Sequence, residues 1–391
     1  MLASLILLSC RPEIAPLQTD TDLVRFRPVP VPSSETARTM TERVPGATWD
    51  AGLARAVDLL VAHAQDPSAR IPPAAQAVAL AHAGYPGHAQ FGRELNGGAF
   101  PDDLVEQVVQ LAIQRDVPVD VALSKRGYAD GRSLWIAAVA ARPVLVDPLP
   151  RDVELDGSLP VTVEALSGEP DMMLYLAPPT GPVEQWPLTN LVGRWLVSFH
   201  VPGEYRAEVV VNDGTRSDVV LLWSFFVESE PAEMQPLPPL STTPESPMQA
   251  ADALYGALAQ LREEAGLGDL VRFEDYEPLA REHAAFMAHS GMVGHVIPGL
   301  TQGVAHQATM RFVPQATHHE NVAAALTWED AHDLAVLSPG HRKNLLCESC
   351  THVAIGTALE PPLDRVPRLF VTWELLEFPN GSPRELQEYD H

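Results

Sequence analysis

Apolar residues recur every three to four positions in several stretches of the first third of the chain. This spacing gathers apolar side chains on one helix face, so each stretch predicts an amphipathic helix. Two later apolar runs around the turn Ala129-Asp130-Gly131 predict a pair of strands. The helices are expected at 49–63, 74–83 and 104–114, and the strands at 119–123 and 133–141. Residues 46–142 therefore predict an N-terminal α+β domain.

The hydrophobic pattern changes over residues 143–228, where short β-branched and aromatic runs are separated by Pro, Gly and Asp turns. Short strands at regular spacing are typical of an antiparallel β-sandwich. They are expected at 161–165, 173–176, 196–199, 205–211 and 219–226. The turn Gly203-Glu204-Tyr205 resembles the start of the F strand of an immunoglobulin-like domain. The resemblance implies a central immunoglobulin-like β-sandwich.

A proline-rich segment, residues 229–247, has neither helical nor alternating apolar spacing and predicts a semi-extended linker. Helical spacing returns after it, in one stripe that ends at Gly266 and in a second helix at 278–290. We expect a third domain over 248–380, followed by a short tail at 381–391.

The N-terminus predicts export and lipid anchoring. The tetrapeptide Leu7-Leu8-Ser9-Cys10 ends a short apolar run and resembles the lipobox of bacterial lipoproteins, in which the cysteine is lipidated. Residues 1–10 are therefore interpreted as a lipoprotein signal peptide. No Lys or Arg precedes the run, so a plain apolar N-terminus is the alternative. Residues 11–45 are rich in Pro, Thr, Ser and Glu and predict a flexible tether.

Length and charge restrict the partners. The chain has 391 residues, 46% of them hydrophobic, and a formal net charge of −25 at pH 7. This length suggests two or three domains, each with its own core. A negative surface repels phosphate backbones and anionic headgroups, so nucleic acid is not an expected partner. No later run reaches the roughly 18 apolar residues of a spanning helix, so we expect membrane contact only through the lipid anchor.

Several blocks in the third domain carry motifs in a fixed order. A helix is followed by Ser290-Gly291-Met292-Val293-Gly294-His295, and then come His319-Glu320-Asn321-Val322-Ala323, Ser338-Pro339-Gly340-His341-Arg342-Lys343-Asn344-Leu345 and two apolar strands at 353–358 and 369–373. They resemble the cleft histidine, the G-E-N-I-A element, the S-P-G-H-R-x-N element and the closing strands of the CAP (SCP-like) superfamily, in its bacterial extracellular branch. The resemblance covers the C-terminal domain and implies an α-β-α sandwich within a multidomain α+β protein.

The S-P-G-H block also has a physical logic of its own. Ser338 can cap a short helix that starts at Pro339, because its oxygen accepts an orphan amide while proline has no amide hydrogen to lose. Gly340 permits close packing. His341 is expected in the first turn, where the helix dipole favours the neutral imidazole that a metal ligand or hydrogen-bond acceptor requires.

The resemblance implies a cleft in which His295, Glu320 and His341 converge. The supporting residues are Asn321, Ser338, Arg342 and Asn344. Two imidazoles and one carboxylate suit Zn²⁺ or another divalent metal, with one position open to water. The alternative is a His/Glu hydrogen-bond network that only stabilises the loops.

The chain departs from the family pattern at several positions. His319 stands where the family has glycine, and Ala335 stands where it has tryptophan. The second glutamate and the strand histidine of the eukaryotic tetrad have no clear match. Trp373 occupies the strand, while Glu329 and His332 lie outside the motif. A complete tetrad is therefore not predicted.

The chain has three cysteines, one near the N-terminus and two close together in the third domain. Cys10 is assigned to lipidation, which leaves Cys347 and Cys350 as a pair that can form a disulfide in an oxidising envelope. The expected order of a helix before this C-x-x-C and a strand after it is the reverse of the order in redox enzymes. A structural disulfide or two inert thiols is therefore favoured over a catalytic pair.

These features favour an envelope-associated or secreted CAP protein whose cleft binds an apolar molecule or a divalent metal without turnover. The sequence holds no G-x-S-x-G, H-E-x-x-H or glycine-rich phosphate loop. Two alternatives stay open: a metal-dependent hydrolase of envelope peptide or polysaccharide, and an adhesion or scaffold protein with an inert cleft. The N-terminal domain is either a degenerate CAP-like copy or a generic α+β domain.

Overall fold

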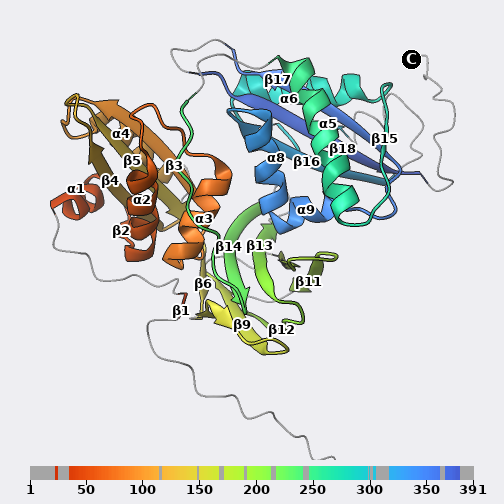
Figure 1. The fold of residues 1–391 in the computed structure, drawn as a ribbon, viewed down its shortest axis with the longest axis horizontal. Coiled ribbons are helices and arrows are strands. Elements are labelled where there is room, and N and C mark those ends of the chain that lie inside the picture. The colour runs from red at the N-terminus through yellow and green to blue at the C-terminus, as the bar shows by residue number, and fades with distance from the viewer. Residues whose placement is uncertain are drawn as a thin grey trace, which may run out of the picture.

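The computed structural model arranges the described residues in three units (Figure 1). These residues are 23–24, 35–113, 117–147, 149–166, 171–188, 192–212, 217–240, 246–297, 299, 303–304, 317–361 and 366–378. The signal peptide with Cys10, most of the tether and the tail at 381–391 lie outside them. Among the helices of the described residues, none is long and apolar enough to span a bilayer.

The N-terminal unit is a four-stranded sheet with helices on both faces. Its elements are α1 (Glu35–Arg43), β2 (Ala47–Trp49), α2 (Ala51–His63), α3 (Pro73–Ala83), β3 (Ala89–Asn96), α4 (Asp102–Ile113), β4 (Val119–Gly127) and β5 (Ser133–Ala141). The sheet order is β2-β4-β5-β3, with β2 parallel to β4 and the other neighbours antiparallel. Helix α2 shares a core with one face, and α1 and α4 with the other. The three predicted helices and two predicted strands correspond to α2, α3, α4, β4 and β5.

The tether prediction is wrong over its last residues. Residues 35–43 form α1, and Ala37 and Met40 are fully buried in the N-terminal core. Together with Val44 they form an apolar stripe of helical spacing, so burial holds this segment on the sheet despite its polar composition.

The central unit consists of short β-strands. They are β6 (Val144–Val146), β7 (Leu149–Pro150), β8 (Asp152–Val153), β9 (Ser158–Ala165), β10 (Asp171–Ala177), β11 (Glu184–Leu188), β12 (Val192–Ser198), β13 (Gly203–Asn212) and β14 (Ser217–Val227). They form the sheets β11-β10-β13-β14-β8 and β12-β9-β6, whose apolar side chains share one core, and β7 pairs with β1 (Leu23–Val24). The Tyr205 hydroxyl accepts the backbone amides of His200 and Val201 at 3.1 and 2.9 Å. The immunoglobulin-like assignment stays a prediction.

The predicted linker does not run free. Met234 and Leu237 are buried, and the Leu237 amide donates to the His63 carbonyl at 3.0 Å. A β-bridge joins Ala69 to Pro239, and the Arg70 amide donates to the Pro238 carbonyl at 2.8 Å. The prolines keep the segment extended, but amides and carbonyls of the segment bind the N-terminal unit. The prediction of a linker with few contacts is therefore wrong.

The C-terminal unit is a sheet between two helical layers. Its elements are α5 (Pro247–Glu264), β15 (Val271–Arg272), α6 (Glu277–Ser290), β16 (Thr317–Ala325), α8 (Trp328–Leu337), α9 (Pro339–Leu345), β17 (His352–Leu359) and β18 (Leu369–Glu377). The sheet order is β15-β17-β18-β16. Helices α5 and α8 bury one face, with Trp373 at its centre, and α6 covers the other. Gly356 lets α6 approach closely, because a Cβ there would lie 2.0 Å from the Ala280 carbonyl carbon.

The N-terminal and C-terminal sheets share one topology. In each, a short first strand runs parallel to the third, which pairs antiparallel with the fourth, and the fourth pairs antiparallel with the second. Helix α2 corresponds to α6, α1 to α5, and α4 to α8 in chain order. A degenerate CAP-like copy would have this topology, and duplication remains our prediction.

The N-terminal and central units share one apolar cluster, and both contact the C-terminal unit through polar groups. Arg70, after α2, donates both to Oδ1 and to Oδ2 of Asp330 on α8, and this carboxylate is 6% exposed. Glu208 of β13 accepts from Ser338 Oγ at 2.6 Å and from the Gly340 amide at 3.1 Å. In Figure 1 the central strands lie below and between the other two units, and α9 reaches down to them.

Candidate functional site

Strand β16, the edge strand of the C-terminal sheet, carries Glu320, whereas His295 follows α6 and His341 lies on α9. Side chains alternate between the faces of a strand, so His318 and Glu320 lie on one face and His319 and Asn321 on the other. The sequence prediction assigned the Glu320 block to a motif without recognising it as a strand. The strand is polar from Thr317 to Asn321 and apolar from Val322 to Ala325.

His295 and Glu320 meet directly. Nδ1 of His295 lies 2.5 Å from Oε1 of Glu320, and the side chains are 51% and 13% exposed respectively. The hydrogen bond to Glu320 raises the pKa of His295. Burial alone would raise the pKa of Glu320, but hydrogen bonds with His295 and Glu374 outweigh it and lower that pKa. The pair is therefore an imidazolium and a carboxylate with one solvent-facing side.

Glu374 is a site residue that the sequence prediction missed. It lies opposite Glu320 in the β16–β18 pairing and is fully buried. Neither of its carboxyl oxygens accepts a hydrogen bond from an amide or hydroxyl of the described residues. Burial, followed by the charge of Glu320, raises the pKa of Glu374 well above its ordinary value, and the protonated carboxyl donates to Glu320. The two carboxyls therefore share one proton at neutral pH.

Two further side chains enclose this carboxyl pair. Nδ1 of His318 lies 3.7 Å from Oε2 of Glu374 and 2.9 Å from the Tyr276 hydroxyl. Burial lowers the pKa of His318 and raises that of Tyr276, so both groups are neutral beside the acid pair. Only the sheet register and the α6 packing bring them here. The signal in the sequence is the acid Glu374, which stands between the apolar residues Trp373 and Leu375 in the interior of β18.

His341 is held by its neighbours in the S-P-G-H block. Ser338 Oγ caps α9 by accepting the His341 amide at 3.3 Å, as the sequence predicted. Asn321 Nδ2 donates to the His341 carbonyl at 2.9 Å, and Asn344 Nδ2 donates to Asn321 Oδ1 at 2.9 Å. Burial lowers the pKa of His341 to about 4, and the charges of His295 and His88 add to the effect. The neutral imidazole that we predicted from the helix dipole is thus chiefly a consequence of burial.

The remaining sequence candidates have other roles. Arg342 Nη1 donates to the Pro178 carbonyl of the central unit at 3.3 Å, so Arg342 supports an interface and not the cleft. Gly340 permits the approach of Glu208, since a Cβ there would lie 2.7 Å from the Glu208 carboxyl. His88 of the N-terminal unit lies within electrostatic range of His341, and no local motif predicted it. Glu329 and His332, which lie outside the family motif, are both on α8, and on the same helix Asp330 pairs with Arg70 of the N-terminal unit.

The predicted three-ligand metal centre is not assembled as such. Within the described part of the chain, the one group of three metal-ligating side chains with atoms within 4.8 Å of one another is His319, Cys347 and Cys350. The two cysteines are joined in a disulfide. His295 and Glu320 are in contact, while His341 joins them only through its electrostatic interaction with His295.

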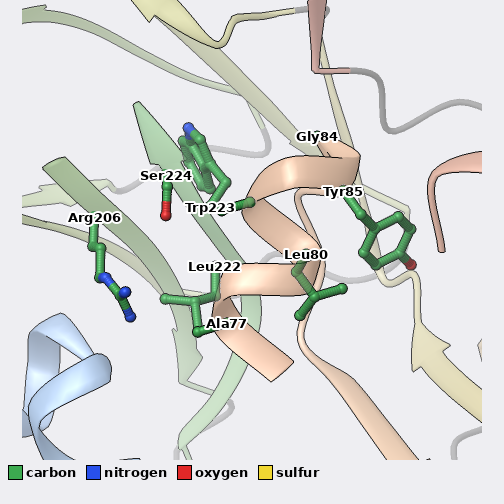
Figure 2. Close-up of a pocket in the computed structure, with 9 residues that line it drawn as sticks. Ala77, Leu80, Gly84, Tyr85, Arg206, Leu222, Trp223 and Ser224 are labelled. Atoms are coloured by element: carbon green, nitrogen blue, oxygen red, sulfur yellow. The ribbon is translucent and has the colours of Figure 1, made fainter. Parts of the chain in front are cut away.

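A separate cavity lies between α3 and β14 (Figure 2). Its volume is about 30 Å³, and Leu80, Tyr85, Arg206 and Trp223 are among the residues that line it. A water molecule needs about 10–15 Å³ in this measure, so the cavity has room for about two waters. The cluster of ionisable side chains around Glu320 is the stronger candidate site.

Comparisons with known proteins identify the class of the C-terminal unit. The model of the cysteine-rich secretory protein family, CAP, matches residues 255–372, which is less than a third of the chain. The C-terminal unit is therefore a CAP domain, carried here on two further units. A search of curated proteins returned no match.

Several solved structures resemble the chain. An outer surface protein from Borrelia burgdorferi is 20% identical, with 35% of this chain and 98% of that chain covered and a TM-score of 0.29. An extracellular SCP-domain protein from Bacillus anthracis str. Ames is 16% identical, with 46% and 66% covered and a TM-score of 0.28. A cysteine-rich secretory protein from Staphylococcus aureus subsp. aureus Mu50 is 14% identical, with 60% and 82% covered and a TM-score of 0.25. These TM-scores are too low to support an argument, so the identification of the domain rests on the family match alone.

Proposed function

We propose that this protein is an extracytoplasmic CAP-domain protein whose His/Glu cleft binds a divalent cation such as Zn²⁺, without a catalytic step. The observation that carries the proposal is the buried Glu374 carboxyl, which lies beside Glu320 and lacks an amide or hydroxyl donor among the described residues. A buried polar group without donors is costly, and a ligand that engages both carboxyls removes the cost.

The donor types fit the cation. Two carboxylates, Glu320 and Glu374, lie beside the imidazoles of His295 and His318, and carboxylate and imidazole are common zinc ligands. When bound, Zn²⁺ would supply a positive charge that stabilises both carboxylates. In the absence of the ion, the negative charge of the two carboxyls is reduced by the proton that they share and is stabilised by the His295 imidazolium. Binding therefore releases protons, and affinity should rise with pH.

The test is a Zn²⁺ titration of the full oxidised chain by calorimetry and thermal shift, at about pH 5.5 and about pH 7.5, on either side of the ordinary histidine pKa. We expect tighter binding and a larger rise in melting temperature at the higher pH. Glu320→Gln and Glu374→Gln should each abolish both effects. Glu329→Gln, which changes an exposed acid on α8, is the matched control and should bind normally. Equal binding by all four proteins would place the ion elsewhere, and no binding would reject the cation.

Hydrolysis of envelope peptide or polysaccharide is the second candidate. One observation favours it: a protonated acid, Glu374, adjoins an ionised one, Glu320, and such pairs divide general acid and base roles in hydrolases. Incubation of the Zn²⁺-loaded chain with peptidoglycan fragments, followed by mass spectrometry, separates the two functions. Product formation that Glu320→Gln abolishes would favour the hydrolase.

For localisation we propose a lipid anchor at Cys10, on the strength of the lipobox-like tetrapeptide. Two or more acyl chains hold a protein stably at a membrane, where one chain does not. Cys10→Ser should move the protein from the membrane fraction to the soluble fraction. A variant that stays with the membrane would exclude acylation of this cysteine as the anchor.

A further inference from the structure

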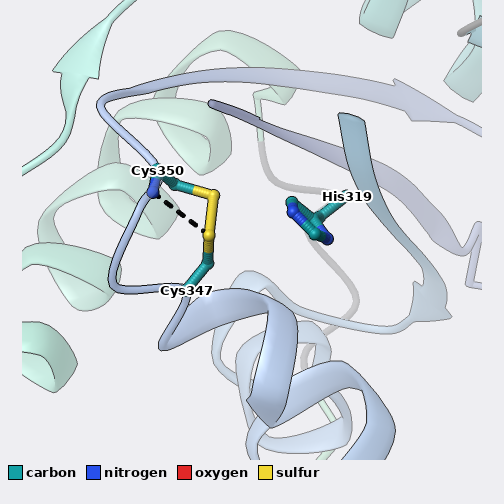
Figure 3. Close-up of side chains that lie close together, drawn as sticks. All are labelled: His319, Cys347 and Cys350. Atoms are coloured by element: carbon teal, nitrogen blue, oxygen red, sulfur yellow. Dashed lines mark hydrogen bonds between the residues drawn. A yellow bond between two sulfur atoms is a disulfide. The ribbon is translucent and has the colours of Figure 1, made fainter. Parts of the chain in front are cut away.

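A second group of metal-ligating side chains lies on the opposite face of β16 from the acid pair. Cys347 and Cys350 occupy the turn between α9 and β17, and His319 projects toward them from β16 (Figure 3). The ring nitrogen of His319 and the two sulfurs lie within 4.8 Å of one another. The sulfurs are bonded to each other in this state.

The histidine has a buried atom that the disulfide state does not use. Nε2 of His319 is buried and has no hydrogen-bond partner among the described residues. Burial lowers the pKa of His319, so the ring is neutral and can offer a lone pair. A buried polar atom without a partner is costly, which makes its position beside two sulfurs informative.

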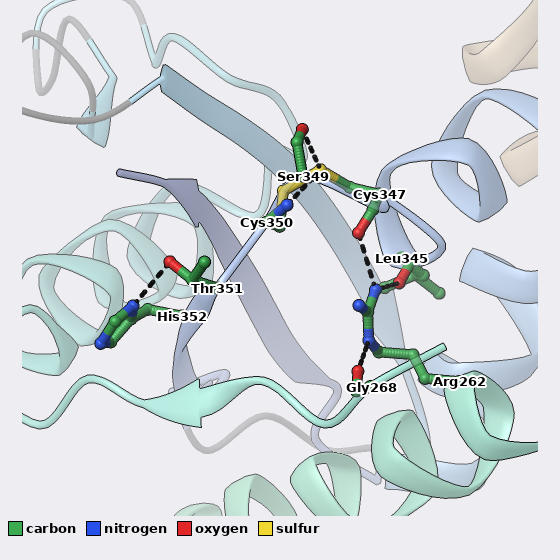
Figure 4. The surroundings of a disulfide bond; sticks show 8 residues. All are labelled: Arg262, Gly268, Leu345, Cys347, Ser349, Cys350, Thr351 and His352. Atoms are coloured by element: carbon green, nitrogen blue, oxygen red, sulfur yellow. Dashed lines mark hydrogen bonds between the residues drawn. A yellow bond between two sulfur atoms is a disulfide. The ribbon is translucent and has the colours of Figure 1, made fainter. Parts of the chain in front are cut away.

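The turn is held by contacts other than the disulfide (Figure 4). Arg262 is 2% exposed and donates to the Leu345 and Cys347 carbonyls at 3.0 Å each and to the Gly268 carbonyl at 2.9 Å. The Cys350 amide donates to Cys347 Sγ at 3.1 Å, and this bond would stabilise a thiolate. These bonds do not need the S–S bond, so reduction leaves the sulfurs near His319.

The disulfide itself adds little constraint. It joins residues three positions apart, and the loop-closure entropy that a cross-link removes from the unfolded chain is small for so short a loop. Arg262 already restrains the start of the turn through the Leu345 and Cys347 carbonyls. A purely structural role therefore explains neither the spacing nor the unpartnered histidine nitrogen.

We propose that reduction of the Cys347–Cys350 disulfide opens a metal site, in which two thiolates and His319 bind a thiophilic cation, Zn²⁺ being the one to test. A dithiol reductant supplies two electrons and two protons, which break the S–S bond and leave two thiols. Metal binding displaces both thiol protons to solvent and forms two metal–sulfur bonds and one metal–nitrogen bond. Two cysteines and one histidine are a known zinc set that leaves a fourth position for water.

The experiment uses the full chain and Co²⁺ as a spectroscopic substitute for Zn²⁺. The protein is reduced with a phosphine under anaerobic conditions and titrated with Co²⁺, and Zn²⁺ is then added as competitor. Reduced wild type should bind one equivalent more than oxidised wild type, with thiolate-to-cobalt charge-transfer absorption, and Zn²⁺ should abolish that absorption. Oxidised wild type should show none. Absorption of equal strength in both redox states, or in neither, would overturn the proposal.

Matched variants test the histidine. His319→Ala should weaken binding by about tenfold or more, since even residues that merely support a ligand contribute that much. His200→Ala changes an exposed histidine of the central unit and should leave the charge-transfer signal unchanged. Equal affinities for His319→Ala and His200→Ala would exclude His319 as a ligand. Cys347→Ser/Cys350→Ser should lose the signal, and if that variant does not fold, the histidine comparison decides.

Discussion

Glu208 is a buried residue of the central unit whose carboxyl forms hydrogen bonds with the start of α9, the helix that carries His341. It is 1% exposed, and it accepts from the Ser338 hydroxyl and the Gly340 amide at the start of α9. Burial raises the pKa of Glu208 from 4.5 to about 7, although both hydrogen bonds oppose the shift. Glu208→Gln keeps the size and shape of the side chain and removes the titration. Its amide can donate to Ser338 Oγ and accept from Gly340.

The sign and size of the effect follow from these values. The folded protein holds the Glu208 proton more tightly than the unfolded chain does, so this proton stabilises the fold below pH 4.5, and the contribution is lost as pH rises through about 7. The difference between 4.5 and about 7 corresponds to about 3 kcal/mol of unfolding free energy. Between about pH 5 and about pH 8, wild type should therefore lose about 3 kcal/mol relative to Glu208→Gln.

The assay is urea unfolding of both proteins at several pH values across this range, followed by tryptophan fluorescence. The two should have similar stability near pH 5 and diverge as the pH rises, with the glutamine variant more stable. Glu184→Gln removes an exposed carboxyl from the same sheet and should show no divergence. A constant difference between wild type and Glu208→Gln at all pH values would refute the reasoning, because it would show that Glu208 does not titrate in this range.

Three other predictions concern contacts between the units. Arg70→Ala leaves the Asp330 carboxylate buried without its cation, so the unfolding free energy should fall by about 3 kcal/mol in thermal or urea melts. The pKa of His341 is lowered to about 4, so the neutral imidazole stabilises the fold above about pH 6.5. This stabilisation is lost as the pH falls toward 4, so the melting temperature of a His341→Asn variant should depend less on acid pH than that of wild type. Limited proteolysis with mass spectrometry should find residues 229–240 protected, because Met234 and Leu237 are buried, and a first cut inside that segment would contradict the docking.

Local sequence patterns predicted most of the regular elements and the S-P-G-H helix with its serine cap, because these depend on residues close together in the chain. They did not predict Glu374 as the partner of Glu320, since that contact depends on the register between β16 and β18. His88 was missed for the same reason, because it approaches His341 from another unit. The tether and the linker were misread because composition was given more weight than sparse apolar positions such as Met40 and Leu237.

The two sheets of shared topology differ in the residues that join the corresponding strands. On the face under α2, the cross-strand pair Phe91 and Ala138 joins β3 to β5 with apolar side chains, whereas the corresponding strands under α6 join through Glu320 and Glu374. Burying two acids lowers the free energy of unfolding but leaves groups that can bind a ligand, whereas an apolar pair stabilises the fold and offers no such groups. At this position of the sheet the CAP domain holds two ionisable groups and the N-terminal unit holds none. A ligand that binds the acid pair and not the unfolded chain would therefore raise the free energy needed to open the CAP domain.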